Sequence, residues 1–167
     1  MEEHKIPANV RVIDLAQDFR LAPEAVYGLP ELHKADIAKA RFVANPGCFA
    51  TCIQLGLLPL AKAGLLKHDV SVNGITGSTG AGQKPGNTTH FSWRNDNISV
   101  YKVFSHQHVA EIRQSLAELQ GSLDASIDFI PYRGDFTRGI FCTEVVRFDG
   151  DEGASSNPTA GQLASLY

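Results

Sequence analysis

An apolar run with helical spacing, which begins at Thr51 and carries no charge until Lys62, constrains the fold of this chain more than any other segment. It follows the turn Asn45-Pro46-Gly47-Cys48, in which proline and glycine end the segment before it. That segment, Arg41 to Ala44, is predicted to be a strand. A strand, a tight turn and a helix in succession are the arrangement that exposes a nucleophile above a sheet.

Cys48 is the candidate nucleophile, because it is predicted to lie in the first turn of that helix. Free backbone N–H groups and the positive end of the helix dipole stabilise a thiolate there, and they lower the cysteine pKa below its free value of about 8.5. A buried core cysteine is the alternative, since free cysteines are among the most buried residues. Cys52 lies one turn further along and is expected to face the core. Cys142 is expected to pack within a strand.

Composition narrows the class of protein. The 167 residues, 43% hydrophobic and 20% charged, suit one globular domain with its own core. The net charge of -3 argues against a nucleic-acid or anionic-membrane surface, so small molecules and protein are the expected partners. Three cysteines do not make a disulfide framework, and the N-terminus resembles no secretory signal. We expect a cytoplasmic protein without a membrane span.

The remaining patterns predict an α+β fold with a mixed or antiparallel sheet and a few long helices. Gly28 and Pro30 indicate a loop, and Gly64 is expected to end the apolar helix as its C′ residue. Helices are predicted over 35–40 and, with an amphipathic pattern closed by Gly121, over 109–119. Strands are predicted over 10–15, 69–76, 98–104, 125–132 and 139–148, the first of them buried. The acidic, turn-rich run from 149 predicts an exposed loop, followed by the start of a helix that is cut off.

His106 and His108 stand directly before the amphipathic helix, where either could serve as the base that a nucleophilic cysteine needs. Helix capping on a solvated loop is the structural alternative. The pair also resembles part of a metal site, but apart from Glu111 no acidic residue or third histidine has ligand spacing, and no metal is expected. Glu111 could orient a histidine or act as a favourable charge in the first helical turn.

The glycine run GSTGAG, residues 77–82, lacks the G-x-G-x-x-G order of a dinucleotide site. It predicts a flexible loop whose backbone N–H groups approach an anionic or carbonyl group, with Ser78 and Lys84 as additional donors. A plain surface loop is the alternative. Arg20 and Arg94 are further candidates for holding a phosphate or carboxylate through two parallel hydrogen bonds.

Taken together, the segments VIDLAQDFRL, YGLPEL, VANPGCFAT, GITGSTGAGQKP, THFS and SHQHVAEI resemble the N-acyl-gamma-glutamyl-phosphate reductase family of arginine biosynthesis. The resemblance covers about Val10 to Phe148 and keeps the order of the family's motifs. It implies a Rossmann domain that binds NADP and a glyceraldehyde-phosphate-dehydrogenase-like α+β domain that carries the nucleophile and much of a dimer interface. The family's glycine fingerprint is missing, so we expect a fragment that lacks most of the NADP site and is inactive alone.

The resemblance also implies roles and boundaries. Cys48 would form a thioester with an N-acyl-glutamyl 5-phosphate, NADPH would reduce it to the semialdehyde, and His106 would act as acid and base. The implied substrate-binding residues are His108, Glu111, Arg20, Ser78 and Lys84, and the implied cofactor-binding residues are Gly77, Gly80 and Gly82. Residues 1–44 would be the connection from the NADP domain, 45–148 the catalytic and dimerisation domain, and 149–167 a loop and truncated helix. A homodimer or homotetramer is expected.

Three alternatives stay open from the sequence. A hydrolase or acyltransferase built on Cys48 and His106 would need no nicotinamide. Aspartate-semialdehyde dehydrogenase shares the thioester mechanism but fits the NPGC and H-x-H segments less well. A domain that only dimerises is the non-enzymatic alternative.

Overall fold

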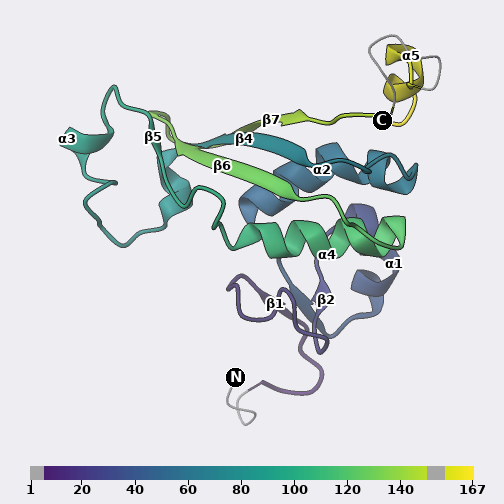
Figure 1. The fold of residues 1–167 in the computed structure, drawn as a ribbon. Coiled ribbons are helices and arrows are strands. Elements are labelled where there is room, and N and C mark those ends of the chain that lie inside the picture. Colours follow the sequence, from purple (N-terminus) through teal and green to yellow (C-terminus); the bar gives the residue numbers. More distant parts are fainter. Residues whose placement is uncertain (1–5, 150–156) are drawn as a thin grey trace. The chain divides into compact units, whose positions relative to one another are not determined.

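The structure, a computed structural model, describes residues 6–149 and 157–167. They form two compact units, Met1–Gly47 and Cys48–Tyr167, which carry the purple and the blue-to-yellow colours of Figure 1. Most of the acidic run predicted as a loop, residues 150–156, lies outside the described residues. No helix in the described ranges is long and apolar enough to cross a membrane.

The N-terminal unit contains a three-stranded parallel sheet in the order β1-β3-β2. The strands are β1 (Val12–Asp14), β2 (Val26–Tyr27) and β3 (Phe42–Ala44), and α1 (Pro30–Lys39) connects β2 to β3. Pro30 opens α1 instead of lying in a loop, because proline is well suited to the first helical turn, where no N–H partner exists. The prediction of a buried first strand was also wrong, since Ile13 is 67% exposed.

The C-terminal unit is built on a four-stranded mixed sheet in the order β5-β6-β4-β7, which confirms the predicted sheet type. The strands are β4 (Val70–Thr76), β5 (Ser99–Val100), β6 (Ile127–Arg133) and β7 (Ile140–Val145). β4 pairs parallel with β6 and antiparallel with β7, and β5 pairs antiparallel with β6. β5 is shorter than predicted because the chain turns after it, with positive φ angles of 46° at Lys102 and 55° at Phe104.

Two long helices, α2 (Cys48–Lys62) and α4 (His108–Gln120), cover one face of this sheet (Figure 1). Alternate residues of the central strand point into the core beneath them, so Val70 and Val72 are fully buried. The opposite face exposes Phe141 (69%) and Val145 (51%). Between β4 and β5 the chain forms the short 3₁₀ helix η1 (Ser78–Ala81) and α3 (Phe91–Arg94).

The helix ends follow the expected chemistry. Gly64 has a φ of +70°, and its N–H donates to Ala61 O (3.0 Å) while Leu65 N–H donates to Leu60 O (3.0 Å). These two bonds form a Schellman motif and confirm Gly64 as the C′ residue of α2. Gly121, with a φ of +89°, is the residue at which α4 ends. At the C-terminal end, Thr159 and Gln162 form a capping box for α5 (Ala160–Ala164).

Candidate active site

The first turn of α2 is anchored by an aromatic contact. Cys48, the first residue of the helix, is exposed, whereas Phe49 is 1% exposed. The Phe49 ring packs edge-on against Phe129 of β6 (5.0 Å between centroids) and against His106 (5.6 Å). The residue that follows the candidate nucleophile is therefore fixed against the histidine pair, as the sequence could not show.

His106 and His108 form a compact pair, with ring centroids 4.5 Å apart and each residue 6% exposed. The backbone N–H of His108 donates to Nδ1 of His106 at 3.3 Å. A ring nitrogen that accepts a hydrogen bond carries no proton, so this contact assigns the proton of neutral His106 to Nε2. The expected solvated loop was wrong, because both imidazoles are buried, whereas the capping alternative is seen in part, since His106 Nδ1 accepts from the first N–H of α4.

Burial also sets the charge of His106. Loss of solvation, followed by the charges of His108 and Lys102, lowers the pKa of His106 to about 4, while Glu111 opposes the shift. At neutral pH the ring is therefore uncharged, with an N–H donor at Nε2. This form donates a hydrogen bond to a developing negative charge on oxygen, and it does not supply a positive charge to hold a thiolate.

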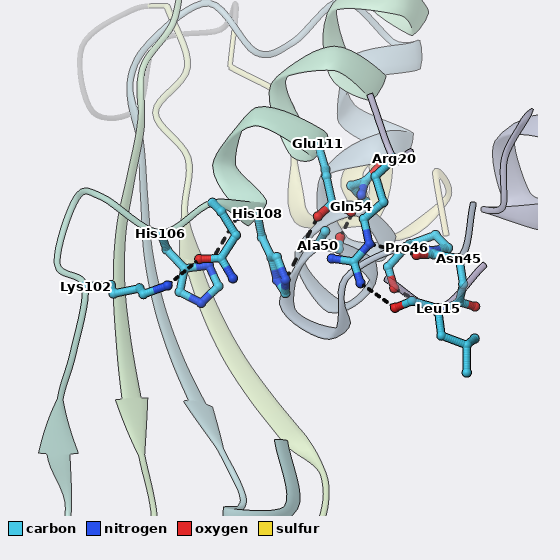
Figure 2. Close-up of polar contacts among 11 residues, drawn as sticks. Leu15, Arg20, Asn45, Pro46, Ala50, Gln54, Lys102, His106, His108 and Glu111 are labelled. Atoms are coloured by element: carbon cyan, nitrogen blue, oxygen red, sulfur yellow. Dashed lines mark hydrogen bonds and ion pairs between the residues drawn. The ribbon is translucent and has the colours of Figure 1, made fainter. Parts of the chain in front are cut away.

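Glu111 lies one turn after His108 on α4, and the two side chains approach each other (Figure 2). Glu111 Oε1 is 4.0 Å from His108 Nε2, and both side chains are almost fully buried. Residues three apart on a helix share a face, which is why the H-x-x-E spacing brings them together. The predicted positions His106, His108 and Glu111 thus form one cluster.

Tyr101 and Arg133 extend this cluster, and sequence reasoning missed both. The Tyr101 ring lies 5.8 Å from that of His106, and Arg133 Cζ lies 4.8 Å from the centroid of Tyr101. Burial raises the pKa of Tyr101, the Arg133 guanidinium opposes the shift, and a Cys48 thiolate would add to it. Strand alternation over 127–133 was the available signal, since it places Arg133 on the face of Phe129.

The glycine run takes a form other than the predicted flexible loop. η1 packs against the segment after β6: Gly77 N–H donates to Gly139 O (3.0 Å) and Ser78 N–H to Phe136 O (2.8 Å). The N–H groups of Gly80 and Gly82 are also used within the loop. A Cβ on Gly77 would lie 2.8 Å from backbone atoms of that segment, so close backbone packing explains the glycine. Its amides are occupied and do not form the open anion cradle that we expected.

The predicted cationic residues occupy different settings. Arg94 is 5% exposed and donates to Asn97 O and to Ser99 Oγ, so it braces the turn before β5 instead of facing a ligand. Arg20, in the N-terminal unit, donates to Asn45 O (2.9 Å) and Leu15 O (3.3 Å), as Figure 2 shows. Lys84 is exposed between η1 and α3 and has no hydrogen-bond or ion-pair partner within the described part of the chain.

Cys52 meets Cys142 of β7 rather than turning fully into the core. Both are half-buried, and a hydrogen bond from Cys142 lowers the pKa of Cys52, while the same contact and burial raise that of Cys142. Glu144 lies on the same face of β7, and burial raises its pKa to about 8. In residues 6–149 and 157–167 no cluster of three or more His, Cys, Asp or Glu side chains could hold a metal ion.

Residues 48–167 match the dimerisation domain of semialdehyde dehydrogenase, and residues 1–40 match the NAD binding domain of semialdehyde dehydrogenase. The chain belongs to the semialdehyde dehydrogenase family. The two matches fall on the two compact units, with the candidate nucleophile at the first residue of the dimerisation-domain match.

Curated relatives of this semialdehyde dehydrogenase chain carry a more specific name. It is 65% identical over 150 residues to N-acetyl-gamma-glutamyl-phosphate reductase of Bacteroides fragilis, covering 88% of this chain and 47% of that protein. It is 55% identical to the enzyme of the same name from Flavobacterium johnsoniae, covering 86% and 46%. The predicted resemblance is therefore confirmed, and the chain spans about half the length of these relatives.

Solved semialdehyde dehydrogenases share the fold. Aspartate semialdehyde dehydrogenase II from Vibrio cholerae superposes with a TM-score of 0.67 at 14% identity, over 93% of this chain and 52% of that one. The Candida albicans aspartate semialdehyde dehydrogenase solved with NADP gives 0.59 at 13% identity, over 93% and 48%. These neighbours confirm the predicted fold class.

Proposed function

We propose that this chain is the catalytic part of an enzyme that reduces an N-acyl-L-glutamyl 5-phosphate to the 5-semialdehyde with release of phosphate. The observation that carries the proposal is an exposed cysteine at the start of α2, next to a phenylalanine packed on a buried, neutral histidine. The relatives named N-acetyl-gamma-glutamyl-phosphate reductase supply the substrate class.

In the proposed reaction, the Cys48 thiolate attacks the carbonyl carbon of the acyl phosphate. A C–S bond forms, the C–O bond to phosphate breaks, and phosphate leaves with the electron pair. The neutral His106 ring donates its Nε2–H to the carbonyl oxygen, which carries negative charge as each tetrahedral species forms. His108 holds His106 through its backbone N–H, and Glu111, in the first turn of α4, places Oε1 4.0 Å from His108 Nε2.

NADP is the proposed cofactor, because residues 1–40 match an NAD binding domain and NADPH supplies the hydride that reduces a thioester. The N-terminal unit supports this in part. It has parallel strands of the required type, but its glycines at 28 and 47 form no G-x-G-x-x-G run. We infer that residues 1–44 are the last portion of the cofactor domain, and that pyrophosphate binding requires residues outside this sequence. Ser78, Lys84 and Arg20 remain proposed substrate-binding residues.

We also propose that the open face of the C-terminal sheet pairs with a second copy of the chain. The match to a dimerisation domain supports an oligomer, and the exposed Phe141 and Val145 supply apolar area on that face. Light scattering of the Phe141→Asp variant tests this pairing. A smaller mass than that of the parent is expected, and an unchanged mass would contradict it.

The test of the reaction uses an enzyme that carries this chain together with a complete cofactor domain. Given the semialdehyde and NADP, it should form NADPH only when phosphate or arsenate is present, because either anion must release the acyl group from Cys48. Release of a free acid without phosphate would support the alternative Cys–His hydrolase and would rule out the reductase.

A further inference from the structure

Arg133 occupies an unusual place for a positively charged side chain. It is the last residue of β6, and strand alternation puts it on the same face as Phe129 and Pro131, the face that the helices cover. Phe129 contacts the rings of both Phe49 and His106. Arg133 therefore lies on the strand face that supports the candidate active site, four residues after Phe129 along β6.

The guanidinium is held firmly but incompletely satisfied. It stacks on Tyr101 at 4.8 Å, and Nη1 donates to Thr88 Oγ1 at 2.9 Å. Its Nε is buried and has no hydrogen-bond partner, and no carboxylate pairs with Arg133 anywhere in the described ranges. A buried N–H without an acceptor costs free energy. A bound ligand that supplies the acceptor removes that cost.

We propose that Arg133 binds an oxyanion of the substrate beside Cys48 and His106. A guanidinium offers parallel N–H groups that match a carboxylate or a phosphate in two-point contact. The stack on Tyr101, whose ring lies 5.8 Å from that of His106, fixes the orientation of this fork near the candidate active site. The inference rests on the proposed function, and it makes Arg133 a determinant of substrate binding and not of bond breaking.

The oxyanion that Arg133 binds could be the phosphate or the carboxylate of the substrate, and kinetics in the direction of NADP reduction distinguish the two. We expect Arg133→Gln to raise one KM roughly 10- to 100-fold, since hydrogen bonds to charged groups contribute about 1.5–3 kcal/mol. A rise confined to the KM for phosphate, repeated with arsenate, assigns the phosphate. A rise confined to the KM for the semialdehyde assigns a carboxylate. Arg133→Lys, which keeps the charge without the fork, should lie between Arg133→Gln and the parent.

Arg147→Gln is the matched control, because Arg147 is exposed beyond β7 on the side of the unit that carries His68 and Asp69. It should leave both KM values unchanged. If Arg133→Gln also leaves both unchanged, or if it lowers only kcat together with the melting temperature, the inference is overturned and Arg133 is structural.

Alkylation of Cys48 provides a readout that needs neither cofactor nor turnover. Iodoacetate and iodoacetamide are similar in size, but only the first carries a carboxylate. We expect the rate of alkylation by iodoacetate, divided by the rate by iodoacetamide, to fall about threefold or more at Cys48 in Arg133→Gln. The reason is that a nearby cation attracts the anionic reagent. If the parent enzyme forms no NADPH, the proposed function fails, and this ratio alone decides for or against an oxyanion site at Arg133.

Discussion

The two cysteines of α2 stand one turn apart and have opposite surroundings. Cys48 is exposed at the start of the helix, next to a phenylalanine packed on the neutral His106. Cys52 is half-buried against Cys142. The carboxyl group of Glu144 lies near it, and burial raises the pKa of that group to about 8. Position along the helix therefore separates an accessible thiol from a thiol held between the helix and the sheet.

The largest expected effect is a difference in kcat between serine variants of Cys48 and Cys52. Cys48→Ser should reduce kcat by at least about 10³-fold, since the nucleophile of covalent catalysis is lost. Cys52→Ser should change kcat less than about tenfold, because its side chain contacts β7. Phosphate-dependent NADPH formation by the enzyme carrying this chain measures both. A comparable loss in the two variants would remove the distinction.

The next largest effect concerns the packing at Gly74, which lies between the Phe49 ring beside Cys48 and the Cys142 thiol beside Cys52. A Cβ on Gly74 would lie 2.7 Å from the Phe49 ring, 3.0 Å from Phe129 and 3.1 Å from Cys142 Sγ. Gly74→Ala should therefore lower the free energy of unfolding by about 1–3 kcal/mol through overpacking. Urea unfolding measures it, with Ser71→Ala on the exposed face as the control. A stability equal to that of the parent would show that the Phe49 ring moves freely.

Glu144 and His106 should give opposite pH dependences of stability. The pKa of Glu144 in the folded state, about 8, lies above its usual value of 4.5, so the folded state holds an extra proton and loses stability as pH rises through this interval. Glu144→Gln should remove that slope and stabilise the protein at pH 8 by on the order of 1 kcal/mol after solvent screening. Melting temperatures at pH 5 and pH 8 measure the change, and an equal shift at both would contradict it.

His106 has the reverse sign. Its folded-state pKa of about 4 lies below the usual 6.5, so the unfolded state takes up a proton first and stability is lost as pH falls through this interval. His106→Gln should flatten the decline by on the order of 1 kcal/mol. Urea unfolding between pH 7 and pH 4.5 checks this. A decline as steep as that of the parent would mean that His106 is charged in the folded protein.

The smallest effect is a ranking of thiol reactivity. Near neutral pH, iodoacetamide should modify Cys48 before Cys52 and Cys142, because access at the helix start outweighs the lowered pKa of the half-buried Cys52. Mass spectrometry of partially alkylated enzyme gives the order. If Cys52 is modified first, the Cys52–Cys142 contact opens readily in solution.

Local sequence patterns predicted the positions of the long helices well, but they predicted the ends of β5 and α1 poorly. The apolar run and the glycines at 64 and 121 placed α2 and α4 correctly, because helix period and C-terminal glycines act over one or two turns. The sequence indicates a loop at Pro30, since a proline at the first position of a helix and one in a turn look alike in sequence. The length of β5 was overestimated, because its end depends on positive φ angles at non-glycine residues.

The sequence by itself determined which chemistry is present: a cysteine at a helix start, two histidines where a second helix begins, and a glutamate one turn later. These follow from spacing within single elements. Only the tertiary structure decided how those groups behave. Burial makes His106 neutral, the segment after β6 occupies the amides of the glycine run, and strand pairing brings Arg133 and Tyr101 to the histidines. Solvation and long-range partners control protonation and donor availability, and no local pattern encodes them.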